Sequence, residues 1–438
     1  MIQIKRLLSL AIVLLTTQIL WAQSNGSNSS YSRFGLGTMN DQSQGWNKGM
    51  GGTAQGLRDG GRLNIQNPAS YTAIDSLAFI FDVGMGIQQV RMSGNGSSVN
   101  AVNASLEYVT AGFRLRPGLG MSIGFVPYST IGYNFTNTGF VGISSTSMQT
   151  ITSRKTYYGN GGLHEMFMGI GWNPFANFCI GANVGYVWGT YNHSLAQTFY
   201  EGSTISSNYN TQNEAWDSDI KTYKLDFGVQ YPIVLNKSNK LTLGATASIG
   251  HTIGSEVSMI RYTSLGDTLE SKVKKAFEMP YTMSAGAAWQ HKEKITLAAD
   301  YTIERWKGCK VPVSLTTPTS SSIQIATDQY YNRHKISVGA EYMQNPLGRR
   351  YGQLIRYRLG ASFATPNVKV NDMKGPREYS LTAGVALPLT TRSRSLINVS
   401  AQWLRRVPSS SSLITENYLM LHLGVTFNES WFMKWRFQ

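Results

Sequence analysis

Residues 223–231, YKLDFGVQY, alternate between apolar and polar side chains without a break. Because successive side chains of a β-strand point to opposite faces, this segment predicts a strand with one apolar and one polar face. The apolar face carries Tyr223, Leu225, Phe227, Val229 and Tyr231, and the polar face carries Lys224, Asp226, Gly228 and Gln230. The same alternation returns in residues 277–290, 295–306 and 418–427. The chain is therefore expected to be all-β.

Fourteen strands are expected along the chain. They cover residues 76–91, 103–116, 118–136, 162–173, 177–199, 215–233, 240–262, 271–291, 293–308, 330–345, 352–365, 375–389, 394–407 and 415–427. A soluble β-sandwich also alternates, so periodicity alone does not identify what the apolar face meets. The even number of strands and their length of roughly ten or more residues favour a single-chain outer-membrane barrel.

The connections between these strands alternate between short and long. The short ones, assigned to the periplasm, are residues 116–118, 173–177, 235–239, 291–293, 345–351 and 389–393. The longer ones, rich in Ser, Thr, Asn and Gly and assigned to the outside, include residues 137–161, 200–214 and 309–329. This pattern predicts a 14-stranded antiparallel transmembrane β-barrel in the outer membrane of a diderm bacterium. Tryptophans near strand ends fit interfacial girdles, with core packing as the alternative: Trp172, Trp289, Trp306 and Trp403.

The N-terminus predicts export. Lys5 and Arg6 precede an apolar run that starts at Leu7 and is first interrupted at Thr16. We therefore assign residues 1–22 to a secretory signal peptide that ends at Ala22. No cysteine lies near this site, so acylation of a new N-terminal Cys is excluded and the barrel itself must anchor the protein.

The composition agrees with this compartment. Charged residues make up 14% of the chain, against about 25% in soluble domains. The net charge of +15 could indicate nucleic-acid binding, but the cations are scattered and the chain is exported. We expect no nucleic-acid partner, and favour a solvated or lipopolysaccharide-facing surface in contact with outer-membrane lipid. Cys179 and Cys309 fall at opposite ends of the predicted barrel, so no disulfide is expected between them.

The polar faces of the strands would line the lumen. They carry Lys224, Asp226, Asp300, Glu304, Arg333, Lys335, Glu341, Arg356, Arg358 and His422. A register that pairs Asn345 with Gly352 would set Glu341 directly across from Arg356. Two interpretations remain for these residues: they hold the wall and a plug together by hydrogen bonds, or they select a solute.

No catalytic motif is present. The chain lacks HExxH, GxSxG, a P-loop and CxxC, and we predict neither a cofactor nor a metal site. Asn192-His193-Ser194 and His164-Glu165 are bare short motifs, with nothing at a defined spacing to orient a base. The sequence therefore predicts a protein that is not an enzyme.

The segment before the first strand has neither strand nor helix periodicity. A 14-stranded barrel is too wide for its own side chains to fill, so it is either plugged or an open pore. Residues 23–75 are polar and glycine-rich and long enough to fold inside the lumen, leaving residues 76–438 for the barrel and a short aromatic C-terminal segment. The glycines of this segment permit irregular backbone close to the wall: Gly51, Gly52, Gly56, Gly60 and Gly61.

Within this segment, Gly52-Thr53-Ala54, Asp59 and Asn67-Pro68-Ala69 resemble the N-terminal hatch of the FadL family of outer-membrane transporters for long-chain fatty acids and hydrocarbons. Residues 32–37, SRFGLG, are similar to elements near the mature N-terminus of that family. The resemblance implies a hatch closed around the NPA tripeptide. It also implies that a hydrophobic ligand enters a luminal pocket and leaves sideways through an opening at a kinked third strand.

The predicted third strand contains Pro127, which cannot donate to the ladder, so a bulge is expected there with Gly124 and Gly132 loosening the same strand. An ordinary barrel bulge and a lateral opening are both consistent with this. The expected ligand is a hydrophobic small molecule or lipid, although no apolar hairpin is evident in the external loops. The alternative function is a non-transporting barrel that serves as a structural or assembly partner in an envelope or secretion complex. Residues 428–438 either extend the last strand or turn back as a tail.

Overall fold

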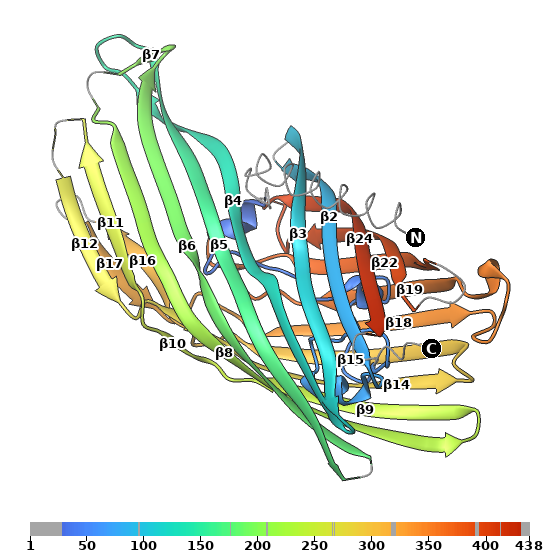
Figure 1. The fold of residues 1–438 in the computed structure, drawn as a ribbon. Coiled ribbons are helices and arrows are strands. Elements are labelled where there is room, and N and C mark those ends of the chain that lie inside the picture. Colours follow the sequence, from blue (N-terminus) through green and yellow to red (C-terminus); the bar gives the residue numbers. More distant parts are fainter. Residues whose placement is uncertain are drawn as a thin grey trace, which may run out of the picture.

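The computed structural model describes residues 29–430, apart from 95–96, 176, 207–208, 265, 267, 317–320, 390–393 and 412. Its main feature is a closed antiparallel barrel (Figure 1). The strands that form the closed ring are β2 (Ala78–Gly94), β3 (Ser97–Arg116), β4 (Leu119–Ile143), β5 (Thr150–Phe175), β6 (Phe178–Glu201), β8 (Gln212–Asn236), β9 (Asn239–Ser248), β14 (Tyr281–His291), β15 (Ile295–Arg305), β18 (Arg333–Met343), β19 (Arg356–Ala364), β22 (Arg377–Pro388), β23 (Leu396–Val407) and β24 (Thr415–Ser430). Each pairs with the next, and β2 pairs with β24 to close the ring.

The predicted 14-stranded barrel is thus confirmed, and so are the faces of most of its strands. Leu419, Leu421 and Leu423 of β24 point outward and are 59%, 52% and 45% exposed, whereas His422 between them is buried. The outward side chains form an apolar belt and the inward ones are largely polar, as a membrane-spanning barrel requires. Among the described residues, no helix is both long and apolar enough to span a membrane.

The strands expected over residues 240–262 and 271–291 were too long, because only β9 and β14 of these stretches belong to the ring. Phe277 and Met279, expected on the apolar outer face, are buried instead, since the ladder is interrupted at Pro280.

The prediction of an external loop at residues 137–161 was wrong for most of its length. β4 and β5 continue as a paired ribbon as far as Ile143 and Thr150, because these Thr- and Tyr-rich residues pair well outside the membrane as well. β4, β5, β6 and β8 reach 24–26 residues, whereas β14, β15 and β18 have 11. One side of the barrel therefore rises as a tall external wall (Figure 1).

Shorter strands complete this external part. They are β7 (Thr204–Ile205), β10 (His251–Ile253), β11 (Glu256–Thr263), β12 (Thr268–Lys274), β13 (Phe277–Met279), β16 (Val311–Thr316), β17 (Ser321–Ala326), β20 (Lys369–Val370) and β21 (Met373–Lys374). A short 3-10 helix, η3 (Tyr351–Gln353), lies in a periplasmic connection. Behind the tall wall, a hydrophobic core forms around Tyr133, Leu163, Tyr191, Val257 and Phe277.

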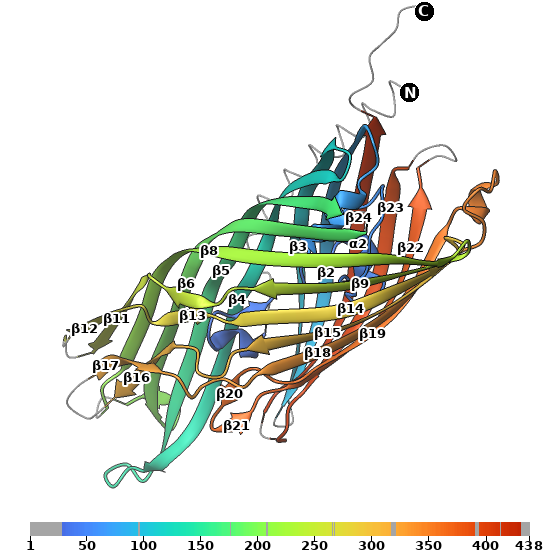
Figure 2. The same cartoon turned by 90° about the horizontal axis from the view of Figure 1, so that it is seen from below.

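The N-terminal segment, residues 29–77, lies within the barrel in both views (Figure 1 and Figure 2). It contains η1 (Ser30–Arg33), β1 (Thr38–Met39), α2 (Gly45–Lys48) and η2 (Pro68–Ala73). The wall meets it through glycines on seven strands: Gly120, Gly171, Gly181, Gly228, Gly244, Gly339 and Gly360. At Gly360, for example, an added Cβ would overlap the backbone of Met50 and Gly51. At all of these glycines except Gly228, which meets the Asn67 and Pro68 side chains, the nearest atom is a backbone atom, so the backbone of this segment lies directly on the backbone of the wall.

The ends of the chain can be placed only in part. Residues 1–22, assigned to a signal peptide, lie outside the described residues. Residues 428–430 extend β24, and residues 431–438 lie outside the described residues. Cys179 and Cys309 are both free and buried.

Candidate functional site

The lower part of the lumen is held by a cluster of arginines around one carboxylate. Glu341 of β18 accepts from Arg62 of the N-terminal segment at 2.7 Å, from Arg358 at 2.7 Å and from Arg356 at 2.9 Å. Glu341 and Arg358 are almost completely buried. The cluster therefore ties the N-terminal segment to two neighbouring wall strands.

The predicted register at this position was wrong by two residues. Glu341 lies opposite Arg358, and Arg356 lies opposite Met343. The turn is longer than expected, because the backbone of Asn345 pairs with Gln353 instead of Gly352. A shift of two residues keeps every side chain on its face, so Arg356 still reaches Glu341 diagonally.

The Asn67-Pro68-Ala69 tripeptide starts the 3-10 helix η2. The Asn67 side chain accepts from the Ala69 backbone N–H at 3.2 Å and so caps the helix. Its amide also donates to the carbonyls of Gln55 at 2.9 Å and Val229 at 3.2 Å. The tripeptide thus joins two parts of the N-terminal segment to strand β8.

The other predicted residues of this segment lie close by. Gly51 has φ +69° and donates its N–H to the Thr382 hydroxyl at 2.9 Å, and Gly52 has φ +78°. Asp59 accepts from Arg62 at 2.7 Å. Burial alone would raise the pKa of Asp59, but Arg62 and Arg356 together lower it to about 2. Asp59 is therefore a carboxylate at neutral pH and holds Arg62 toward Glu341.

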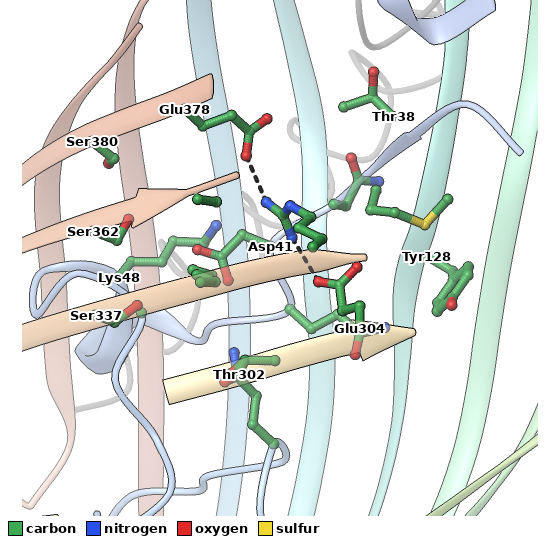
Figure 3. A pocket seen from close by; sticks show the side chains of 18 of the residues that line it. Thr38, Asp41, Lys48, Tyr128, Thr302, Glu304, Ser337, Ser362, Glu378 and Ser380 are labelled. Carbon is green, nitrogen blue, oxygen red and sulfur yellow. Dashed lines mark hydrogen bonds and ion pairs between the residues drawn. The ribbon is translucent and has the colours of Figure 1, made fainter. Parts of the chain in front are cut away.

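Above this packed region lies a cavity of 390 Å³, lined by charged and hydroxyl side chains. Arg333 donates to Glu304 and to Glu378 at 2.6 Å each, and the dashed lines that end on these two labelled glutamates in Figure 3 mark the contacts. Across the cavity, Lys48 lies 3.1 Å from Glu107. Burial opposes the charge on Lys48, but Glu107 and Asp41 raise its pKa above the ordinary value.

His422, predicted to face the lumen, lines the same cavity and contacts Glu107 at 2.6 Å. Its other ring nitrogen lies 3.1 Å from the Gln402 side chain. Most charges around the cavity are thus paired with one another, so the wall presents a polar lining that is neutralised locally.

The wall beside the cavity has a seam between β3 and β4. The β3–β4 ladder runs only from Val109 and Phe125 down to Arg116 and Leu119, although β3 extends up to Ser97 and β4 to Ile143. Above Val109 the two strands diverge (Figure 1). The cavity is lined by residues from both sides of the seam, namely Ser105, Leu106, Glu107, Pro127 and Tyr128.

The seam coincides with the irregularity expected at Pro127. The β4–β5 register shifts between Pro127 and Ser129. Asn40 of the N-terminal segment covers this point, because its backbone N–H donates to Tyr128 at 3.0 Å and its side chain donates to Pro127 at 3.4 Å. β1 also pairs with Ser129 and Thr130.

The two glycines expected to loosen this strand remain in regular ladder positions. Gly124 leaves room for the Phe167 ring, since an added Cβ would come within 2.7 Å of it. Gly132 contacts the N-terminal segment, because its backbone N–H donates to the Ser32 hydroxyl at 3.1 Å. Both therefore serve packing at this point, whereas the register shift itself lies at Pro127.

The histidines weighed as catalytic bases lie apart from the cavity. His193 is buried against Tyr133 and Tyr191, and its Nδ1 contacts the Tyr133 hydroxyl. His164 points outward beside Phe125 and Trp188. Among the described residues no three metal-binding side chains are grouped so that they could hold an ion.

Sequence reasoning missed the charged residues of the N-terminal segment that reach the wall, above all Arg62, Lys48 and Asp41. A signal for them was present, because charged side chains within a segment that must be buried in a lumen need partners on the wall.

The family model named BamG matches residues 1–438, the whole length of the chain. The chain belongs to the BamG family. No match was found among curated proteins. The fold of the chain is also similar to the folds of several solved barrels.

Three of these barrels illustrate the likeness. The toluene transporter TbuX of Ralstonia pickettii has a TM-score of 0.61 at 14% identity, over 91% of this chain and 99% of that chain. The toluene transporter TodX of Pseudomonas putida has 0.59 at 16%, over 91% and 100%. A Pseudomonas aeruginosa FadL homologue has 0.59 at 12%, over 90% and 99%. The FadL-like fold expected from Asn67-Pro68-Ala69 is confirmed.

Proposed function

We propose that this protein is an outer-membrane channel for a small hydrophobic compound with a polar end, which leaves the lumen sideways through the β3–β4 seam. The observation that carries the proposal is that the 390 Å³ cavity is lined by residues on both sides of that seam. Solved barrels with similar folds include toluene transporters and a FadL homologue.

The N-terminal segment serves as the hatch in this proposal. Its close packing on the wall glycines blocks passage along the barrel axis, which leaves the seam as the route out of the cavity. Asn40 and β1 cover the seam from within through a few hydrogen bonds. A displacement of residues 38–42 would therefore open the lateral path without loss of the lower packing.

The cavity lining argues for an amphipathic ligand and against a bare hydrocarbon. Lys48, Lys335 and Arg333 line it together with Glu107, Glu304 and Glu378. A wholly apolar molecule gains nothing from these groups and would strip water from them. A carboxylate with an acyl chain could share the cations while its chain follows the seam into the membrane.

A cross-link across the seam tests the lateral route. In a Cys179→Ala/Cys309→Ala background, Leu106→Cys and Tyr128→Cys are joined with a bifunctional maleimide, and uptake of labelled oleate is measured in a strain that lacks the native gene. We expect uptake to fall at least about tenfold, because the linker spans the gap between the diverging strands and obstructs the lateral path.

The matched control joins Gln88→Cys and Met420→Cys, which line the same cavity but are direct partners in the closed β2–β24 ladder. This link should leave uptake unchanged. Equal loss from both links would refute the seam as the route, and no oleate uptake by the parent protein above the deletion strain would refute transport of such a ligand.

A second candidate is the non-transporting partner role, and the periplasmic turns favour it. Leu347 is 91% exposed, next to exposed Arg349 and Arg350, and exposed Lys237 and Lys292 lie in two other periplasmic turns. An apolar side chain among cations suits an acidic protein surface. A photo-reactive residue in place of Leu347 should then give one discrete cross-linked protein in cells, whereas the same residue in place of lipid-facing Val184 should not.

A further inference from the structure

The outer wall carries a groove of 500 Å³ across β18, β19, β22 and β23, on the opposite face of the wall from the luminal cavity. Two rows of outward side chains line it, as the strand registers show. The upper row is Ile336, Phe363, Tyr379 and Arg405, and the lower row is Val338, Ala361, Leu381 and Trp403. Small Ala361 between Val338 and Leu381 gives the groove its depth.

Most of this groove is apolar and exposed. Ile336, Leu381 and Trp403 are each more than 40% exposed, and the Phe363 and Tyr379 rings pack at 5.1 Å between centroids. In a barrel that spans the outer membrane such a surface meets acyl chains. Below it, outward Ala383 and Ala401 face each other in the ladder, so no large side chain blocks a chain that continues toward the periplasm.

The extracellular end of the groove is cationic. Arg405 lies opposite Tyr379, and Arg377 lies two residues further out on β22. Both arginines are exposed, and neither forms an ion pair with any described residue. Their neighbours Arg406 and Glu378 point inward and pair at 2.8 Å, so they do not neutralise the outer face.

On the four described strands that line the groove, no outward-facing acid balances these two cations. Among the outward-facing residues of β18, β19, β22 and β23, none is Asp or Glu. A third outward arginine, Arg91 on β2, faces Asn417, which in turn faces Arg405. At a spacing of about 4.8 Å between neighbouring strands, these guanidiniums can approach one anion.

We propose that this groove binds a phosphorylated acyl lipid of the outer leaflet, with an acyl chain along the apolar rows and the phosphate on Arg377 and Arg405. Tyr379 and Trp403 are aromatic side chains of the kind that lie at the membrane interface, which puts the arginines at headgroup level. Guanidinium groups bind phosphate with two parallel hydrogen bonds. The site does not depend on the proposed transport function and requires only that the barrel spans the outer membrane.

Native mass spectrometry of the detergent-purified full chain tests the proposal by titration with diphosphoryl lipid A and with phosphate-free digalactosyl diacylglycerol. We expect the parent to bind lipid A more tightly. Arg377→Gln/Arg405→Gln should weaken lipid A binding by about 10- to 30-fold and leave the galactolipid unaffected. Ala361→Trp, which fills the groove, should weaken the binding of both lipids.

Arg349→Gln/Arg350→Gln removes the same charge from a periplasmic turn and should leave lipid A binding unchanged. The proposal is overturned if this control loses as much affinity as Arg377→Gln/Arg405→Gln, if the latter binds like the parent, or if the parent binds both lipids equally. It is also overturned if Ala361→Trp displaces a co-purified protein from the groove and not a lipid.

Discussion

The lower and upper halves of the lumen are packed in different ways. In the lower half, wall glycines bring the backbone of the N-terminal segment onto the backbone of the barrel, and Arg62 joins Glu341 inside. In the upper half, side chains surround a cavity, and one wall junction has lost its ladder. This difference in packing is what the proposed function relies on: it requires the lower half to stay shut and the upper half to open sideways at the seam.

The largest expected effect comes from Gly360→Leu in the lower half. A side chain there would overlap the Met50 and Gly51 backbone, which cannot move aside as a flexible side chain would. We expect the N-terminal segment to leave the lumen, so that conductance in a planar bilayer rises from near zero to that of an open pore.

Gly352→Leu is the matched control, because an added Cβ at Gly352 in the periplasmic connection meets nothing within 4 Å. It should conduct like the parent. Equal conductance of Gly360→Leu and the parent would show that backbone contact at this strand is not what closes the lower half.

The barrel strands could be predicted from the sequence, because the alternation of apolar and polar side chains reflects which face of each strand meets lipid and which meets the lumen. A two-residue period fixes the lipid and lumen faces of β8, β15 and β24, so the strand count and these faces were predicted correctly. The register at Glu341 was missed, because it depends on how the connection at Asn345 folds. The external wall was missed, because Thr and Tyr pair as strands above the membrane as readily as they form loops.

The contacts of the N-terminal segment could be predicted less well. Asn67-Pro68-Ala69 and the glycines predicted a segment that folds inside the lumen, but its wall partners come from strands more than a hundred residues away. Nothing local in the sequence couples Arg62 to Glu341. The seam is an intermediate case, since Pro127 predicted the register shift but not that Asn40 would cover it.

A smaller effect is expected from Glu341→Ala, which leaves Arg62, Arg356 and Arg358 without their shared carboxylate. Breaking a buried ion pair on one side costs about 3–5 kcal/mol, because the remaining charge stays uncompensated. Unfolding of the protein in lipid vesicles with guanidinium chloride should show this loss in the free energy of unfolding.

The matched control is Glu270→Ala, which removes an ion pair with Lys272 on the external strands, where both side chains are about half exposed. Such an exposed pair contributes little to stability, because water and salt screen it. If the two variants lose the same free energy of unfolding, the arginine cluster does not hold the lower half together.

The smallest effect is expected at Asn67, where one side chain performs two separable tasks. Asn67→Ala removes the cap on η2 and both hydrogen bonds to the Gln55 and Val229 carbonyls, which should cost about 2 kcal/mol. Asn67→Ser keeps an oxygen that can cap the helix but cannot reach strand β8. Hydrogen exchange at the Ala69 amide then separates the tasks. If the cap dominates, the Ala69 amide should exchange more slowly in Asn67→Ser than in Asn67→Ala. If the amide exchanges equally fast in both variants, the contact of Asn67 with strand β8 is what stabilises the turn.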